Sequence, residues 1–246
     1  MGNALSDVQL AIASIRNGVG ALLRIAPTQT PRRFDVTIVG TTWCVTRDRV
    51  FLTAHHVLNT GNPRDTSHRF YVLSAPGNGH TLNFWPVSGF RLEDAARDLV
   101  LFDAPVPTDR GLSVPSIPVA VSAPADGTAV LTYGCPAPTI AGGRVSDQGE
   151  LLAIQTVLFT HANTGIVSAQ YEGFPLTDTL FEFSVGWHHG ESGGPVLRLE
   201  PQPAAFAVMQ HYRNIQGPHG TMAGPRRGLG LAAIREDLER AGATLV

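Results

Sequence analysis

Gly190-Glu191-Ser192-Gly193-Gly194-Pro195 carries a single hydroxyl, that of Ser192, among small residues. Glycines at these positions let the backbone turn sharply and let another chain approach closely. The Gly-Gly-Pro that follows the serine disfavours a helix. Taken alone, such a turn is most often a structural loop. It becomes a candidate catalytic site when a base lies beside it, because a serine hydroxyl is a weak nucleophile near neutral pH.

Two upstream segments supply a histidine and a carboxylate in suitable surroundings. His56 lies at the end of the apolar stretch Phe51-Leu52-Thr53-Ala54-His55-His56-Val57, and Asp98 directly precedes Leu99-Val100-Leu101-Phe102. A histidine that acts as a base needs an acceptor on its second ring nitrogen, which fixes its tautomer. The chain has nine histidines, so one could occur at a suitable position by chance. We therefore select His56 by the residues that surround it.

The order of these residues along the chain tests a rival fold. Gly-x-Ser-x-Gly also occurs in the nucleophile elbow of α/β-hydrolases, where an acid and then a histidine follow the serine. The only aspartate after Ser192 is Asp237, and no histidine follows it. Glu200 with His211 or His219 keeps the order, but at spacings too short for that fold. The order histidine, aspartate, serine is therefore favoured.

Composition limits the class of protein and its partners. The 246 residues are 43% hydrophobic and 15% charged, with 26 glycines and 18 prolines, which is typical of a packed protein with many short strands. A formal net charge of −2 favours neither nucleic acid nor an anionic membrane as a partner. Cys44 and Cys135 are too few for a disulfide framework, and we interpret them as buried thiols.

No basic segment followed by an apolar one resembles a secretory signal, and no run of 18 apolar residues could form a membrane helix. We therefore expect a cytoplasmic protein without a membrane partner.

The pattern along the chain predicts an all-β protein in two halves, with a helix near each end. Ser6 followed by apolar residues at helical spacing predicts an N-terminal helix over 6–17. Four prolines mark 105–118 as the link between a first barrel over about 19–104 and a second over about 119–234. A short helix over about 234–241 ends at Gly242. We treat 1–246 as one domain, with strands expected near 19–25, 36–46, 50–53, 69–74, 81–87, 99–104, 128–133, 151–159, 178–185, 195–199, 205–211 and 229–234.

The segments around His56, Asp98 and Ser192 together resemble the three signature segments of the trypsin-like (chymotrypsin-fold) serine peptidases. Gly40-Thr41-Thr42-Trp43-Cys44-Val45 resembles the strand that precedes the histidine in the bacterial branch of that family. The resemblance runs from about residue 18 to residue 234. It implies two antiparallel six-stranded β-barrels with an active site in the cleft between them.

The resemblance also implies a role for each residue of the site. Ser192 would be the nucleophile, His56 the general base and then acid, and Asp98 the carboxylate that orients it. The amides of Gly190 and Ser192 would form the oxyanion hole. Glu191 departs from the family, where aspartate or asparagine is more usual. In members activated by cleavage this carboxylate pairs with the new N-terminus, and we expect here either a constitutively formed site or one gated by a partner.

The specificity pocket follows from the same resemblance. Its base would lie at Gly186, and no carboxylate is there to select arginine or lysine in a substrate. Protonatable His188 or His211 would suit an acidic side chain. The residues expected along the pocket are Gly186, Trp187, His188, Gln210, His211 and Tyr212.

These observations predict a serine endopeptidase, an intracellular processing enzyme that cleaves a specific protein or peptide. An effector protein encoded beside it is one candidate partner. The alternative is a peptidase-like binding module that is catalytically silent or gated by a partner. We expect no cofactor, because the chain lacks lysine and hence a phosphate-binding loop with its lysine. We expect no metal, because His55-His56 and His188-His189 lack the spacing of ligand pairs.

Overall fold

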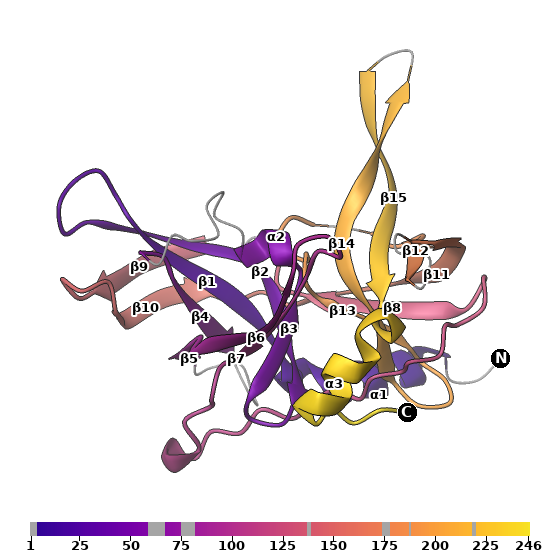
Figure 1. Ribbon diagram of the computed structural model, residues 1–246, viewed down its shortest axis with the longest axis horizontal. Helices are drawn as coiled ribbons and strands as arrows, with labels where there is room; N and C mark the ends of the chain where they lie inside the picture. The colour runs from indigo at the N-terminus through magenta and orange to yellow at the C-terminus, as the bar shows by residue number, and fades with distance from the viewer. Residues whose placement is uncertain are drawn as a thin grey trace.

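The computed structural model describes residues 4–58, 67–74, 82–136, 139–173, 178–186, 188–217 and 220–246. Strands dominate, and they form two groups, with the N-terminal and C-terminal helices beneath them in the view of Figure 1. The trypsin-like, mostly β fold expected from the sequence is confirmed. No helix in the described part of the chain combines the length and the hydropathy needed to cross a bilayer.

The first half forms a single antiparallel sheet of seven strands in the order β5-β4-β1-β2-β3-β7-β6. Among the described residues this sheet is not closed by hydrogen bonds, so the prediction of a closed six-stranded barrel is corrected for this half. The strands are β1 (Val19–Pro27), β2 (Phe34–Thr46), β3 (Val50–Thr53), β4 (Arg69–Ser74), β5 (Asn83–Pro86), β6 (Gly89–Asp94) and β7 (Leu99–Asp103).

The first sheet stays open because of the two residues between β5 and β6. Val87 donates to the carbonyl oxygen of Phe70 on β4 at 2.9 Å, and Ser88 donates to that of Asp103 on β7 at 2.8 Å. One continuous stretch of chain therefore changes partner between consecutive residues. The sheet curls round at this point because the chain itself passes from one edge to the other, and no ladder joins β5 to β6.

The second half contains the closed six-stranded barrel that the sequence predicts, in the order β11-β12-β15-β14-β13-β8. A separate two-stranded sheet pairs β9 with β10. The strands of this half are β8 (Ala129–Gly134), β9 (Thr139–Val145), β10 (Leu151–Val157), β11 (His161–Glu172), β12 (Thr179–Phe183), β13 (Pro195–Arg198), β14 (Ala204–Gly217) and β15 (Gly220–Gly230).

The sequence patterns did not predict three of the strands: β6, β9 and β11. In β11 only Val167 is buried, and the other residues are half-buried or exposed. A strand of this kind has no apolar run and no clean alternation, which are the two patterns that predict strands. The strand expected over 229–234 ends earlier, because β15 stops at Gly230 and a 3-10 turn, Leu231–Ile234, follows.

Two short helices flank the sheets, as expected. Helix α1 (Ala4–Ile15) begins two residues before the predicted start and continues as a 3-10 turn, Arg16–Gly18. Helix α3 (Arg235–Ala241) ends at Gly242, whose φ of 82° is the left-handed conformation of a C-cap. A single helical turn, α2 (His55–Leu58), follows β3. A further 3-10 turn, Thr108–Arg110, lies in the connection between the halves.

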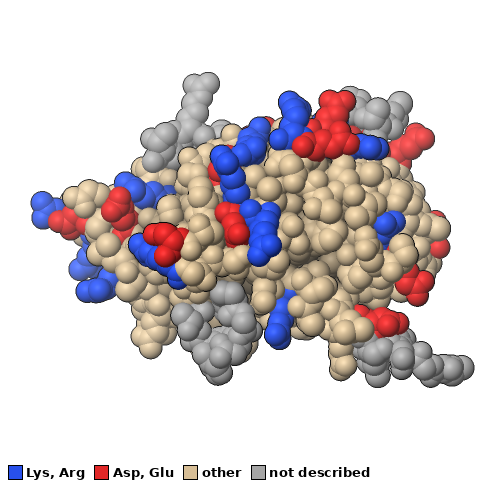
Figure 2. All heavy atoms as spheres, turned by 90° about the horizontal axis from the view of Figure 1, so that it is seen from below, with Lys and Arg blue, Asp and Glu red and all other residues tan. Residues whose placement is uncertain are grey.

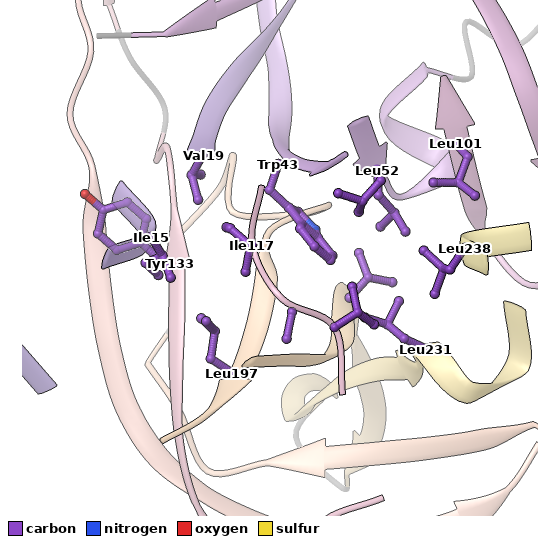
Figure 3. Packing of buried hydrophobic residues seen from close by; sticks show 14 of the residues in the cluster. Ile15, Val19, Trp43, Leu52, Leu101, Ile117, Tyr133, Leu197, Leu231 and Leu238 are labelled. Carbon is purple, nitrogen blue, oxygen red and sulfur yellow. The ribbon is translucent and has the colours of Figure 1, made fainter. Parts of the chain in front are cut away.

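The largest core cluster joins the two halves, as Figure 3 shows. Trp43 and Leu52 from the first sheet meet Leu197 from the barrel and Leu238 from α3, and all four are fully buried. Each half also has its own aromatic core, with Phe51 stacked on Phe102 in the first and a Phe181, Phe183 and Phe206 group in the second. Burial of the apolar side chains that the two halves share fixes the halves against each other.

Charges on the face drawn in Figure 2 are mixed in sign, with arginines and carboxylates side by side. Arg91 and Arg49 both bond to Asp103 at the end of β7. Arg240 pairs with Asp237 within α3 at 2.6 Å. This face therefore presents no broad field of one sign, in keeping with the small net charge.

Candidate active site

The histidine and the aspartate are brought together by neighbouring strands. β3 pairs with β7 so that Thr53 lies opposite Val100. His56 follows the end of β3 in α2, and Asp98 precedes the start of β7. Because the two strands are antiparallel neighbours, the end of one and the beginning of the other lie at the same edge of the sheet.

Both carboxylate oxygens of Asp98 bind the same residue. His56 Nδ1 lies 2.8 Å from Asp98 Oδ2, and the backbone N–H of His56 donates to Oδ1 at 2.8 Å. A carboxylate only accepts hydrogen bonds, so Nδ1 carries the proton and the lone pair is left on Nε2. The imidazole of His56 is 44% exposed, which makes Nε2 accessible to a reacting group.

Contacts from the second half hold the Asp98 loop. The side-chain amide of Gln210 on β14 donates to the carbonyl oxygens of Arg97 and Asp98. The Arg97 guanidinium pairs with Asp178 at 2.8 Å and with Asp94 at 3.2 Å. The hydrogen bond to Asp178 is the main reason that the pKa of Arg97 lies above its usual value. The loop that carries Asp98 is thus tied across the two halves.

The Ser192 turn is anchored on both halves as well. Thr41 N–H on β2 donates to the carbonyl oxygen of Ser192 at 2.8 Å, and Gly193 N–H donates to Met209 on β14 at 2.7 Å. Gly193 has a φ of 86°, and a Cβ there would collide with Thr53 Oγ1 and the Thr41 carbonyl oxygen. Glycine is therefore required by both conformation and space.

The hydroxyl of Ser192 donates to the backbone carbonyl oxygen of Gln210 at 3.0 Å. The hydrogen bonds of the described residues include none between this hydroxyl and His56. Catalytic hydrogen bonds are often long or absent in unliganded enzymes and form when substrate binds. Gln210 nevertheless contacts the serine through its carbonyl and the Asp98 loop through its side chain, so one residue joins both parts of the site.

The two amides expected in an oxyanion hole are unoccupied by backbone acceptors. Among the described residues, neither Gly190 N–H nor Ser192 N–H donates to a backbone oxygen. Gly190 has a φ of 98°, and its carbonyl oxygen accepts a hydrogen bond from Thr41 Oγ1 at 2.7 Å. The described part of the chain therefore supplies no backbone acceptor that competes with an anionic ligand oxygen for these two amides.

Glu191 is the residue of this turn whose surroundings the sequence did not reveal. Its carboxylate is only 5% exposed. It accepts hydrogen bonds from His161 Nδ1 at 2.9 Å, from Asn163 Nδ2 at 3.2 Å and from His188 N–H at 3.1 Å. His161 and Asn163 belong to β11, a strand that no pattern predicted, and only the tertiary structure brings them to the turn.

The residues expected along the specificity pocket are only partly described. Gly186 is exposed and faces Asn163, whose Oδ1 would lie 3.0 Å from an added Cβ. His188 is exposed, and its ring meets that of His161 edge-on, with the ring centroids 4.4 Å apart. Gln210 is 4% exposed, with its amide directed at the Asp98 loop. Trp187 and the side chains of His211 and Tyr212 lie outside the described residues.

The two cysteines are unsuited to nucleophilic chemistry. Cys44 and Cys135 are buried and free, and burial raises the pKa of each thiol to about 12. Both thiols therefore stay protonated near neutral pH and are poor nucleophiles. Within the described ranges, no group of three or more His, Cys, Asp or Glu side chains is arranged to hold a metal ion.

Comparison with known proteins bears on the family and the fold. The family model described as "Trypsin-like peptidase domain" matches residues 40–202. A crystal structure of Deg5 superposes with a TM-score of 0.68 at 12% identity, over 96% of this chain and 94% of that one. A structure of the HtrA-type protease AlgW with a decapeptide superposes with a TM-score of 0.63 at 13% identity, over 97% of this chain and 69% of that one. No curated protein sequence matches.

Proposed function

The chain belongs to the family of trypsin-like peptidase domains, and on this premise we propose that it is a serine endopeptidase that acts through Ser192, His56 and Asp98. The supporting observation is the pair of contacts made by Gln210. Its carbonyl oxygen accepts from the Ser192 hydroxyl, while its side-chain amide donates to the backbone of Asp98, which binds His56. The nucleophile and the base–acid pair are thereby tied to one residue.

A second contact supports the same proposal. Gly40 on β2 lies between α2 and the serine turn, since an added Cβ would be 2.5 Å from Val57 Cγ1 and 3.0 Å from the Ser192 carbonyl oxygen. Val57 directly follows His56. The helical turn that carries the base is therefore packed close to the turn that carries the nucleophile.

Acylation would proceed as follows. The Ser192 hydroxyl leaves the Gln210 carbonyl by rotation about χ1, and its oxygen attacks the carbonyl carbon of the peptide bond while His56 Nε2 takes its proton. Asp98 stabilises the imidazolium through Nδ1–H. The C–N bond then breaks as Nε2–H protonates the leaving amine, which leaves an ester on Ser192.

Deacylation repeats these steps with water. The water oxygen attacks the ester as His56 accepts its proton, and the serine oxygen leaves with that proton. In both stages the Gly190 and Ser192 amides would bind the oxyanion. Loss of one such donor lowers the rate by about 10² to 10³ in enzymes where it has been measured.

The direct test is reaction of the purified chain with a fluorophosphonate probe, with the modified residue mapped by mass spectrometry. We expect one probe per chain, attached to Ser192. Ser192→Ala and His56→Ala should abolish the modification, because the first lacks the nucleophile and the second lacks the base.

Two matched variants control this experiment. Ser122→Ala removes an exposed serine hydroxyl that is distant in sequence from the turn, and it should label normally. His55→Ala removes the neighbouring histidine, which is 8% exposed and lies 3.4 Å from Glu93 Oε1. It should label while lowering the melting temperature. Full labelling of a folded His56→Ala variant would contradict the proposed role of that residue.

The Ser192 hydroxyl is bonded to Gln210 and, among the described residues, not to His56, which favours a second candidate function: a peptidase-like binding module that is silent or gated by a partner. In that case the Ser192 hydroxyl stays hydrogen-bonded to the Gln210 carbonyl oxygen, and the folded protein does not react with the probe. Labelling that begins only when a partner protein is added would identify the gated form.

We propose an extended protein or peptide segment as the substrate and the cytoplasm as the location. The AlgW structure contains a decapeptide, which supports the first proposal by likeness of fold. Two free, buried cysteines support the second, because disulfides are rare in reducing compartments. Degradation of co-expressed candidate proteins by the wild type, and not by Ser192→Ala, tests the substrate proposal.

A further inference from the structure

Glu191 lies between the two residues whose amides would form the oxyanion hole. Its carboxylate is 5% exposed, so water does not solvate it. A buried carboxylate is strongly unfavourable unless hydrogen-bond donors surround it. The donors around Glu191 therefore determine where this side chain can lie, and with it the conformation of residues 190–192.

Two of the donors come from the beginning of β11. His161 Nδ1 and Asn163 Nδ2 both bind Oε1, at 2.9 Å and 3.2 Å. The two residues are separated by one position on a strand and therefore point to the same face. Nδ1 of His161 carries the hydrogen that it donates in the bond to Glu191. Asn163 Nδ2 lies 3.3 Å from this nitrogen, but two donors face each other there, so the contact is not a hydrogen bond.

The neighbouring strand leaves room for this arrangement. β8 pairs with β11 so that Gly134 lies opposite His161. An added Cβ on Gly134 would lie 3.2 Å from both Cα and Cγ of Glu191. The next residue, Cys135, is buried, and the charge of Glu191 helps to raise the pKa of its thiol, which stays neutral. β8 therefore admits the Glu191 side chain without adding a competing charge.

The remaining contacts connect the carboxylate to the oxyanion turn. Oε2 of Glu191 accepts from His188 N–H at 3.1 Å, and Glu191 N–H donates back to the His188 carbonyl oxygen at 3.3 Å. These two bonds close residues 188–191 into a ring. Gly190 lies within this ring with a φ of 98°. The direction of its N–H therefore depends on how firmly the carboxylate is held.

We propose that His161 and Asn163 are positioning residues, which hold the Glu191 carboxylate and through it the Gly190 and Ser192 amides in the geometry that binds an oxyanion. This inference rests on the proposed peptidase function. The two side chains act through Glu191, whose carboxylate accepts hydrogen bonds from donors of this chain. Their loss should reduce stabilisation of the transition state and leave the initial binding of a ligand unchanged.

Saturation kinetics with the fluorophosphonate probe separate these effects, because the phosphoryl oxygen occupies the oxyanion position only as the bond to serine forms. We expect Asn163→Ala and His161→Leu to lower the maximal labelling rate by about 10-fold to 10³-fold, with the half-saturating probe concentration unchanged. Thr164→Ala, an exposed neighbour on β11, is the matched control and should label at the wild-type rate.

Conservative variants distinguish positioning from a general loss of structure. His161→Asn keeps an N–H donor near the place of Nδ1 and should stay within about 5-fold of the wild-type rate, unlike His161→Leu. Asn163→Asp keeps the shape but sets a second carboxylate against Glu191, and should be slower than Asn163→Ala. Adding Glu191→Gln to Asn163→Asp restores a donor–acceptor pair and should recover part of the rate.

The outcomes separate the inference from the function on which it rests. If the wild type labels at Ser192 and folded Asn163→Ala and His161→Leu label at the same maximal rate, the positioning role is wrong and the peptidase proposal stands. A change confined to the half-saturating concentration would also overturn it, because that indicates contact with the ligand. If the wild type itself never labels, with or without partners, the proposed function fails and the inference falls with it.

Discussion

At the scale of single residues, Asp98 combines two unusual features. Its carboxylate binds both the ring and the backbone N–H of His56, and its backbone has a φ of 54°, in the left-handed region. Aspartate and asparagine tolerate this region better than other residues with a Cβ. The conformation turns the chain so that the side chain reaches His56 just before β7 begins.

This geometry makes Asp98→Asn an informative change. Asparagine fits the backbone conformation, but its neutral amide cannot stabilise the imidazolium or hold the same tautomer. We expect the labelling rate to fall by about 10⁴-fold, as such a change does in serine peptidases, with an unchanged melting temperature. Asp109→Asn, in the exposed 3-10 turn, is the control. A folded Asp98→Asn variant with full activity would show that this carboxylate has no catalytic role.

At the scale of elements, Gly40 sets the distance between α2 and the serine turn. We expect Gly40→Ala to push Val57 and the Ser192 backbone apart, because the new methyl would lie 2.5 Å from Val57 Cγ1. The labelling rate should fall by about 10-fold or more, since displacement of reacting groups by a fraction of an ångström is costly. Gly142→Ala on β9 is the matched control, because nothing lies within 4 Å of its added Cβ.

The β6–β7 edge has its own electrostatic support, which depends on pH. Arg91 on β6 binds both oxygens of Asp103 on β7 at 2.9 Å, and this pair is the main cause of the lowered pKa of Asp103. A lowered pKa in the folded state means stability that is present above the unfolded pKa and lost as the pH falls through the folded one.

Asp103→Asn should therefore lower the free energy of unfolding near neutral pH. The difference from the wild type should shrink as the pH falls below the usual carboxyl range and through the lowered pKa of folded Asp103, because the residue is then protonated in both states. Urea unfolding at a series of pH values measures it. A difference that stays constant over this range would mean that the ion pair does not contribute.

At the scale of the whole molecule, the candidate site depends on how the halves meet. The shared core around Trp43, Leu197 and Leu238 fixes the overall orientation. Polar contacts near the site add to it, since Arg97 from the first half binds Asp178 of the second, and Asp178 is 2% exposed. This ion pair lies one residue from Asp98 and thus couples the interface to the site.

Arg97→Met tests that coupling, because it leaves a buried carboxylate with fewer partners. We expect the free energy of unfolding to fall by about 2–3 kcal/mol, which is less than for a fully buried pair because Arg97 is a quarter exposed. The labelling rate should fall as well. Arg97→Met combined with Asp178→Asn should lose less, since the buried charge is gone. Urea denaturation of both variants measures the difference. Equal losses would indicate that the charge of Asp178 is immaterial.

The fold class was predictable from local patterns. Apolar strands such as β3 and β7, small-residue turns and proline-rich connections depend on neighbouring residues, so they predicted an all-β protein in two halves. That the first sheet is not closed was not predictable, because Val87 and Ser88 change partner through backbone hydrogen bonds, which do not depend on the identity of the side chain. β11 was missed because its residues are half-exposed and show no periodicity.

For the candidate site, the sequence by itself determined which residues to consider: a serine among glycines, a histidine after an apolar strand and an aspartate before another. Their chemistry is local, and so are the patterns that mark them. Only the tertiary structure decided what holds them: Gln210 links Ser192 to Asp98, and His161 and Asn163 surround Glu191 from about 30 residues away. The physical reason is that burial creates the need for these partners, and burial exists only once distant strands have packed together.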